Sequence, residues 1–170
     1  ANNLKGNDLK LIRCKSVEET TEGADIITIC TACYGHFNIL KKDWVKAGVH
    51  INAIGGDSKG KTELEKSILP MCRIVVEYFE QSKDEGEIQV FTKAKAKKLV
   101  YAQLYELIKG HKKGRGSKEE VTLFDSVGIA LEDYSVLRLI YTLSQKYNIG
   151  ENVNITPKVK DPKDLYGLLN

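Results

Sequence analysis

The chain has 170 residues, of which 42% are hydrophobic and 29% charged, and its formal net charge is +3. This length allows one ordinary domain with a real core, and the composition is that of a folded globular protein. A charge of +3 is too small to indicate a nucleic-acid-binding protein, and no apolar run approaches the roughly 20 residues that span a bilayer. No charged-then-apolar leader opens the sequence, so we expect a soluble, cytoplasmic protein without nucleic-acid or membrane partners.

The first predicted elements are a short helix and a buried strand. Ser16 offers a side-chain cap for the helix, Glu19 completes a capping box three residues later, and Gly23 is a stop signal. Residues 24–31 (ADIITICT) form a β-branched, nearly continuous apolar run. Such a run is typical of a strand that is buried on both faces.

The middle of the chain predicts a turn, two strands and a helix. Residues 41–46 form a short amphipathic turn around Trp44, and residues 49–54 form an apolar strand. A glycine-rich loop follows and leads into a helix over residues 62–69. Residues 73–79 (RIVVEYF) indicate a further strand.

The remaining elements are mostly helical. Residues 85–90 and 101–108 have helical patterns, and the lysines of residues 93–98 indicate a solvated face. Residues 121–124 (VTLF) form a last strand, and residues 128–147 form a long helix with recurring leucines. Strands that alternate with helices predict an α/β domain with a largely parallel sheet.

Three loops draw attention because of their place in such a sheet. In parallel sheets, ligands bind in the crevice beyond the carboxyl ends of the strands. The loop after Thr31, the loop after Ile54 and residues 125–128 all begin at such ends. We therefore expect the functional site where these three loops meet.

Residues 55–62 (GGDSKGKT) match the phosphate-binding pattern G-x-x-x-x-G-K-[ST]. In a P-loop, backbone N–H groups and a helix N-terminus surround the phosphates, and the lysine reaches the outer ones. Asp125, after the last strand, could hold the magnesium ion. Asp57, however, would place a negative charge beside the phosphates.

Asp57 allows two other interpretations. A carboxylate at the mouth of a cleft, beside Lys61, is placed to accept and return a proton. It could equally cap the turn or the following helix. The residues alone leave nucleotide hydrolysis, acid–base chemistry and a purely structural role open.

Four cysteines are present, and two of them form a lone C-x-x-C motif at Cys30 and Cys33. A structural zinc site would need a second such pair, and Cys14 and Cys72 do not supply it. A redox motif would open a helix, whereas this motif closes a strand-like run. We expect buried, reduced thiols and no metal.

Several segments resemble one known family in order along the chain. Residues 50–64 (HINAIGGDSKGKTEL) are similar to the signature of the ornithine cyclodeaminase/mu-crystallin family. The further segments with the same resemblance are residues 76–78, 85–89, 121–128, 130–134 and 161–166. Several of them are more similar to the cyclodeaminase branch than to the reductase-like or crystallin branches.

This resemblance implies a partial Rossmann-type, doubly wound parallel sheet. Residues 1–145 would be the carboxyl-terminal part of an NAD-binding domain that lacks its first two strands and its glycine fingerprint. Residues 146–170 would return to a mostly absent substrate and dimerisation domain. The resemblance also implies a homodimer in the full-length protein.

The reaction implied by the resemblance is the conversion of L-ornithine to L-proline and ammonia. NAD takes a hydride from the substrate and later returns it, so that the cofactor is recycled. Asp57 corresponds to the catalytic acid–base carboxylate and contacts the substrate together with Val127. The residues implied to contact the cofactor are Thr31, Ile51, Asn52, Ala53, Ile54, Lys61 and Ser126.

Other functions remain open. The same family architecture could serve an imine reductase or an amino-acid dehydrogenase, and the chain could be an inactive or partner-binding half-domain. A P-loop NTPase is the least favoured alternative. One departure from the family pattern is Lys59, where a proline commonly precedes the glycine, and it predicts a looser loop.

Overall fold

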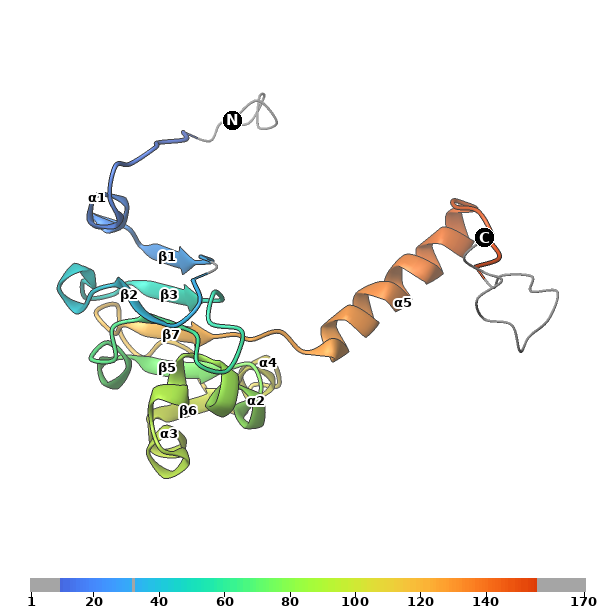
Figure 1. The fold of residues 1–170 in the computed structure, drawn as a ribbon. Coiled ribbons are helices and arrows are strands. Elements are labelled where there is room, and N and C mark those ends of the chain that lie inside the picture. The colour runs from blue at the N-terminus through green and yellow to red at the C-terminus, as the bar shows by residue number, and fades with distance from the viewer. Residues whose placement is uncertain (1–9, 32, 156–170) are drawn as a thin grey trace, which may run out of the picture. The chain divides into compact units, whose positions relative to one another are not determined.

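The computed structural model describes residues 10–31 and 33–155 and divides the chain into two compact units (Figure 1). The first unit comprises residues 1–129 and the second residues 130–170. The predicted boundary between residues 145 and 146 is a different kind of division, by family architecture, and it stays a prediction.

The first unit is built on a five-stranded sheet. Every neighbouring pair of strands is parallel, which confirms the predicted α/β class. In spatial order the strands are β1 (Ile26–Ile29), β3 (His50–Ala53), β7 (Thr122–Asp125), β5 (Arg73–Val76) and β6 (Val100–Gln103) (Figure 1).

The core lies against one face of this sheet. Every second residue of β3, β7 and β5 is buried, as the two-residue period of a strand requires. Ile51, Leu123 and Ile74, which lie side by side in these strands, are almost fully buried. Residues 24–31 were expected to be buried on both faces, and this is wrong for β1. Ile27 and Ile29 are buried, but Ile26 is 63% exposed, because it points with Thr28 to the opposite face of the sheet, and that face of β1 is exposed within the described residues.

Short helical elements precede or follow the strands. The predicted cap of α1 (Val17–Thr21) is confirmed, since the Ser16 side chain accepts a hydrogen bond from the N–H of Glu19. The turn around Trp44 is a 3₁₀ helix, η2 (Lys42–Trp44). After β5, the chain forms α2 (Phe79–Glu85), η4 (Glu87–Val90), α3 (Lys93–Leu99) and α4 (Leu104–Ile108).

The helix predicted for residues 62–69 is wrong. Thr62–Leu64 is a strand, β4, which pairs in parallel with β2 (His36–Leu40), a strand that the sequence did not indicate. All three residues of β4 are buried, and the buried carboxylate of Glu87 accepts hydrogen bonds from the N–H groups of Glu63 and Leu64. Tertiary contacts therefore override the local pattern, and the helical part is only a short 3₁₀ turn, η3 (Leu69–Met71).

The boundaries of two other segments differ from the prediction. Strand β5 ends three residues early, and the helix α2 begins where the strand was expected to continue. Residues 101–108 combine the end of β6 with α4, whose start is a capping box between Gln103 and Glu106. Apolar runs this short fit either element, so the sequence pattern did not resolve them.

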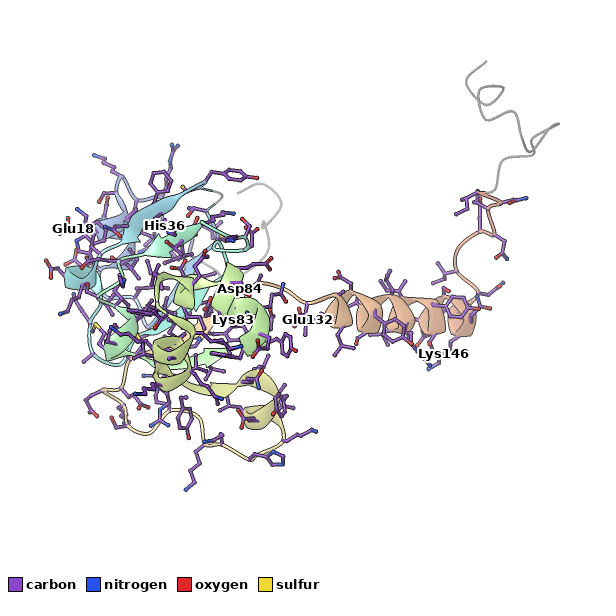
Figure 2. The ribbon with its side chains drawn as sticks, turned by 60° about the horizontal axis from the view of Figure 1, so that its bottom comes forward. Glu18, His36, Lys83, Asp84, Glu132 and Lys146 are labelled. Atoms are coloured by element: carbon purple, nitrogen blue, oxygen red, sulfur yellow. The ribbon has the colours of Figure 1, made fainter. Side chains whose placement is uncertain are left out.

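The second unit contains the predicted long helix, α5 (Ala130–Tyr147). None of its residues is buried, and Figure 2 shows its side chains projecting around the helix, from Glu132 in the first turn to Lys146 in the last. No helix in the described residues is long and apolar enough to cross a membrane. The family-like segment 161–166 lies outside the described residues.

We expect the 170-residue chain, produced by itself, to associate. Strand β1 pairs on one side only in the described part, and α5 exposes large apolar side chains such as Leu137 and Tyr141. Light scattering after size exclusion should give a mass above the 19.0 kDa of one chain. Leu137→Lys should lower that mass, whereas Gln145→Lys on the same helix should not. A monodisperse, cooperatively melting wild-type monomer contradicts the prediction.

Candidate functional site

The carboxyl ends of β1, β3 and β7 lie side by side. The N–H of Ile54 donates to the carbonyl of Ile29, and the N–H of Ser126 donates to the carbonyl of Ala53, both at 3.0 Å. These bonds continue the parallel ladders past the strand ends. The loops that begin at Thr31, Ile54 and Ser126 therefore leave the sheet at adjacent points, as expected from the sequence.

The loop after β3 presents an ion pair at this edge. The Nζ atom of Lys61 lies 2.7 Å from Oδ1 of Asp57. The lysine side chain is only 8% exposed, whereas the aspartate side chain is 52% exposed. The hydrogen bond that Lys61 donates to Asp57 raises the pKa of Lys61 above its ordinary value. A buried cation thus holds a carboxylate that solvent and small molecules can reach.

The residues around the ends of β1 and β3 differ in what they can offer a ligand. The side chains of Ile51 and Ala53 are buried in the core, so only their backbone is available. Ile54 is 43% exposed and presents an apolar surface at the edge. Thr31 is exposed and lines a cavity of about 420 Å³ between α1, β1 and β2.

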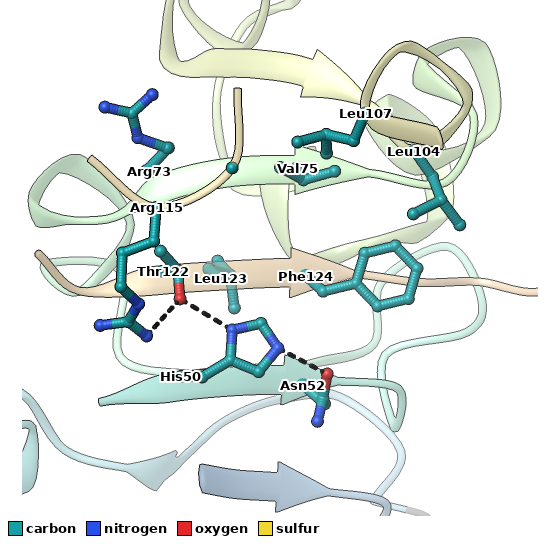
Figure 3. A pocket seen from close by; sticks show the side chains of 11 residues that line it. His50, Asn52, Arg73, Val75, Leu104, Leu107, Arg115, Thr122, Leu123 and Phe124 are labelled. Carbon is teal, nitrogen blue, oxygen red and sulfur yellow. Dashed lines mark hydrogen bonds between the residues drawn. The ribbon is translucent and has the colours of Figure 1, made fainter. Parts of the chain in front are cut away.

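Asn52 points away from this edge, onto the other face of the sheet (Figure 3). Its Oδ1 atom lies 3.0 Å from Nε2 of His50, whose Nδ1 lies 2.8 Å from the Thr122 hydroxyl. Because Oδ1 of Asn52 can only accept, Nε2 of His50 carries the hydrogen of that bond, and the Thr122 hydroxyl also accepts from Arg115. The Asn52 amide donates onward to Thr28. These residues line or border a cavity of about 450 Å³, separate from the Asp57–Lys61 pair.

Glu77, which follows β5, holds the loop after β7. Its carboxylate accepts hydrogen bonds from the Ser126 hydroxyl at 2.9 Å, from the N–H of Val127 at 3.1 Å and from the N–H of Gly128. Ser126 and Val127 therefore occupy defined positions at the edge of the sheet. The oxygen of Ser126 keeps its capacity to accept a hydrogen bond.

Two fully buried carboxylates connect the loops in series. Asp125, the last residue of β7, accepts from the N–H groups of Glu87 at 2.9 Å and Ile88 at 3.2 Å. Glu87 in turn accepts from the N–H groups of Glu63 at 2.8 Å and Leu64 at 3.1 Å. Each carboxylate thus fixes the backbone of the next segment.

A third acid, Glu63, extends this series to the loop after β1. Its Oε1 atom lies 3.4 Å from the N–H of Cys33, and its Oε2 atom is buried against Gly55. Sequence reasoning missed the roles of Glu63 and Glu87. Both residues stand in polar stretches of the sequence, so no local signal marked them as buried.

Burial changes the protonation of the two connecting carboxylates. It raises the pKa of Glu87 to about 8, although the N–H groups of Glu63 and Leu64 act in the opposite direction. It also raises the pKa of Asp125 to about 7, again against two N–H donors. Both groups therefore titrate in or near the neutral range.

The structure removes the context that a P-loop requires. The loop leads into strand β4, so no helix N-terminus follows Lys61, and the lysine is paired with Asp57. Asp125 is buried and occupied by backbone donors rather than available to magnesium. Within the described residues, no cluster of three or more His, Cys, Asp or Glu side chains could hold a metal ion.

The four cysteines are unpaired. Cys30 is exposed, so the expectation of buried thiols is wrong there, because the end of β1 lies at the open edge of the sheet. Cys14, Cys33 and Cys72 are partly buried, and burial raises the pKa of the Cys72 thiol to about 12.

Comparison with known proteins identifies the family. The model of the ornithine cyclodeaminase/mu-crystallin family matches residues 1–147. The chain belongs to this family. It is 44% identical over 167 residues to an ornithine cyclodeaminase of Brucella abortus, which covers 98% of the chain and 45% of the relative. The chain thus spans less than half the length of that relative.

Two solved structures share the fold. An archaeal alanine dehydrogenase dimer with bound NAD has a TM-score of 0.74 and 37% identity, covering 84% of this chain and 44% of its own. The Δ1-pyrroline-2-carboxylate reductase of Thermococcus litoralis, in complex with NADH and L-proline, has a TM-score of 0.76 and 31% identity. That match covers 82% of this chain and 44% of the reductase. The Rossmann-type nature of the sheet is thereby confirmed.

We predict that Gly55→Ala lowers the free energy of unfolding of the full-length protein by about 1–3 kcal/mol, because the added methyl group has no room and the atoms around it must move. An added Cβ would lie 1.8 Å from Oε2 of Glu63 and 2.7 Å from the carbonyl oxygen of Thr31. Gly114→Ala is the matched control, since nothing lies within 4 Å of its added Cβ. Urea unfolding of both variants measures the difference, and equal stabilities would contradict the close packing.

The raised pKa values of Glu87 and Asp125 predict that stability falls as the pH rises. The unfolded state loses these two protons above its ordinary pKa of about 4, whereas the folded state keeps them up to a higher pH. The free energy of unfolding therefore decreases from about pH 4 up to about pH 8. Urea unfolding of the full-length protein between pH 5 and pH 8 measures this slope. Glu87→Gln should flatten the slope of unfolding free energy against pH. Glu120→Gln should leave this slope unchanged, because Glu120 is partly exposed and forms an ion pair with Arg73.

Proposed function

We propose that the chain is the carboxyl-terminal part of an ornithine cyclodeaminase-like enzyme. It converts L-ornithine to L-proline and ammonia, with NAD as a recycled hydride carrier. The observation that carries this proposal is the reachable carboxylate of Asp57, held by the buried Lys61 at the carboxyl edge of a parallel sheet. The 44% identity to a cyclodeaminase supports the choice of reaction within the family.

The residues at this edge fit the nicotinamide end of NAD. Exposed Thr31 offers a hydroxyl, half-exposed Ile54 offers an apolar surface for a planar ring, and the Ser126 oxygen can still accept a hydrogen bond. When bound, NAD supplies a reversible hydride acceptor. Ile51 to Ala53 would contribute backbone groups, and Lys61 would contribute positive charge beside Asp57.

Asp57 handles protons in this proposal. As a base it takes a proton from the substrate amine, and it returns a proton to the nitrogen that leaves as ammonia. The Lys61 ammonium keeps the carboxylate in place between the two steps, because the pair is a charge-assisted hydrogen bond of 2.7 Å. Val127, on the loop held by Glu77, would contact the substrate.

The rest of the enzyme would come from sequence beyond this chain. Residues 1–145 would complete a dinucleotide-binding domain, and residues 146–170 would join the substrate and dimerisation domain of a cytoplasmic homodimer. The exposed apolar residues of α5, including Leu137 and Ile140, support this view, since isolated helices do not keep such surfaces in water.

A second reaction within the family has specific support. The two similar structures are an alanine dehydrogenase and a pyrroline carboxylate reductase, and both reactions leave a net change in the nicotinamide cofactor. Net NADH that appears or disappears in step with substrate would favour this alternative. A cyclodeaminase leaves no net change.

Two further alternatives have their own tests. A partner-binding half-domain would show an intact natural chain of about 19.0 kDa that binds no NAD in calorimetry. A P-loop NTPase would show magnesium-dependent ATP binding that Lys61→Ala abolishes. The strand that follows Lys61 argues against the second of these.

We predict that Asp57→Asn in the full-length enzyme lowers the rate of proline formation from ornithine by about 100-fold or more, since the general acid–base is lost. Asp43→Asn, at an exposed aspartate in η2, is the matched control and should retain the wild-type rate. Proline is measured by chromatography after reaction with ornithine and NAD. An undiminished rate in Asp57→Asn removes this residue from its assigned role.

A further inference from the structure

The loop that carries Asp57 and Lys61 is held by one side chain from another element. Gln89, in η4, accepts a hydrogen bond at its Oε1 from the N–H of Gly60 at 2.6 Å. Its Nε2 donates to the carbonyl of Ser58 at 3.2 Å and to that of Lys61 at 3.0 Å. One amide group thus binds three of the last four residues of the loop.

The chemistry of these partners fixes the orientation of the amide. Gly60 offers a donor, so it must face the amide oxygen, and the carbonyls of Ser58, Lys61 and Gly86 must face the amide nitrogen. Every polar atom of the Gln89 side chain is therefore engaged by the protein. Gln89 acts on the loop and not on a ligand.

Gln89 is itself fixed from the centre of the sheet. The N–H groups of Glu87 and Ile88, in the same 3₁₀ turn, are bound by the carboxylate of Asp125 at the end of β7. The Glu87 carboxylate binds the backbone just after the loop, at Glu63 and Leu64. The loop is consequently tied at both its middle and its end to one turn whose place relative to β7 is set.

The loop's own contacts are few by comparison. Inside it, the N–H of Lys61 donates to the carbonyl of Ser58 at 3.1 Å, and at its end Thr62 donates to Gly35 at 3.1 Å. Gly60 has a φ of +81°. Glycine adopts this and many other backbone conformations freely, so the residue itself does not fix the shape of the loop. The amide of Gln89 thus makes three hydrogen bonds to the backbone of residues 58–61, whereas this backbone makes one within itself.

We propose that Gln89 is a positioning residue for the Asp57–Lys61 pair. It does not touch the reacting groups. Its amide sets the backbone of residues 58–61, and this backbone places the lysine so that its ammonium meets the carboxylate at the edge of the sheet. The proposal rests on the acid–base role of Asp57 given above.

The test uses two variants of Gln89 in the full-length enzyme. Gln89→Leu removes both the donor and the acceptor, whereas Gln89→Glu keeps an acceptor for Gly60 but loses the donors to Ser58 and Lys61. Both should lower kcat by about 10- to 100-fold, because displacement of a catalytic group by about 1 Å has an effect of that size. KM for NAD should change by less than kcat, because Thr31, Ile54 and Ser126 keep their places at the edge of the sheet.

A matched control uses a glutamine of the same kind at another place. The Gln103 side chain accepts a hydrogen bond from the N–H of Phe79 at 3.0 Å, far along the chain from the loop. Gln103→Leu removes this bond together with the side-chain cap of α4 and should keep the wild-type kcat. Equal losses of kcat in Gln89→Leu and Gln103→Leu would mean a general effect on stability and overturn the proposal.

A second readout reports the geometry without turnover. The Lys61 side chain is nearly buried and paired with Asp57, so its acylation by an amine-reactive reagent should be slow in the wild type. The same acylation should be several-fold faster in both Gln89 variants. Exposed Lys66 is the internal reference, and mass spectrometry of peptides gives both rates. Wild-type acylation of Lys61 together with unchanged kcat in folded variants overturns the proposal.

The wild-type protein provides a measurement if neither variant folds. Hydrogen exchange at the amide of Gly60 should be slow, because that amide is bound to Gln89. Exchange as fast as in the exposed segment 113–115 would overturn the proposal. Acylation and exchange do not depend on the reaction, so a fully active Asp57→Asn would remove the proposed function while leaving the role of Gln89 in the loop to be judged separately.

Discussion

Two buried carboxylates, those of Asp125 and Glu87, each accept two backbone N–H groups, and the arrangement of the whole site depends on these bonds. A charge removed from water is costly unless donors surround it, and here the donors belong to the segment that must be positioned. The end of β7 thereby fixes η4, and η4 fixes the start of β4. Loops without regular structure acquire defined places because buried acids bind their backbones.

The glycine-rich loop takes its shape from this arrangement. Gly55 and Gly56 lie against Glu63 and Glu87, so a side chain at either position would meet a buried carboxylate. The loop can then turn its polar residues, among them Asp57, toward the open edge. A proline commonly stands at position 59 in the family, and its absence predicted a looser loop. Gln89 instead binds the loop at three of its residues.

Sequence reasoning succeeded where one strong local pattern decided the structure. The strands around Ile51, Val75 and Leu123 were predicted, as was their parallel arrangement, because apolar runs separated by helical segments allow little else. It failed over residues 62–69, where a helical pattern lost to the backbone contacts of β4. It also missed Glu87 and Gln89, since nothing in a short polar stretch shows which distant backbone its side chains will bind.

The sequence by itself determined the class of the fold, the family and the identity of Asp57 and Lys61 as the polar pair of the loop. The fold class follows from periodicity, the family from the resemblance of residues 50–64 to its signature, and the pair from its four-residue spacing in the same segment. Only the tertiary structure decided that Lys61 is buried beneath an exposed Asp57, that the loop leads into a strand, and that Asp125 is buried. Burial and the partners of a carboxylate depend on segments up to 51 residues apart, and no local pattern records which of them will meet.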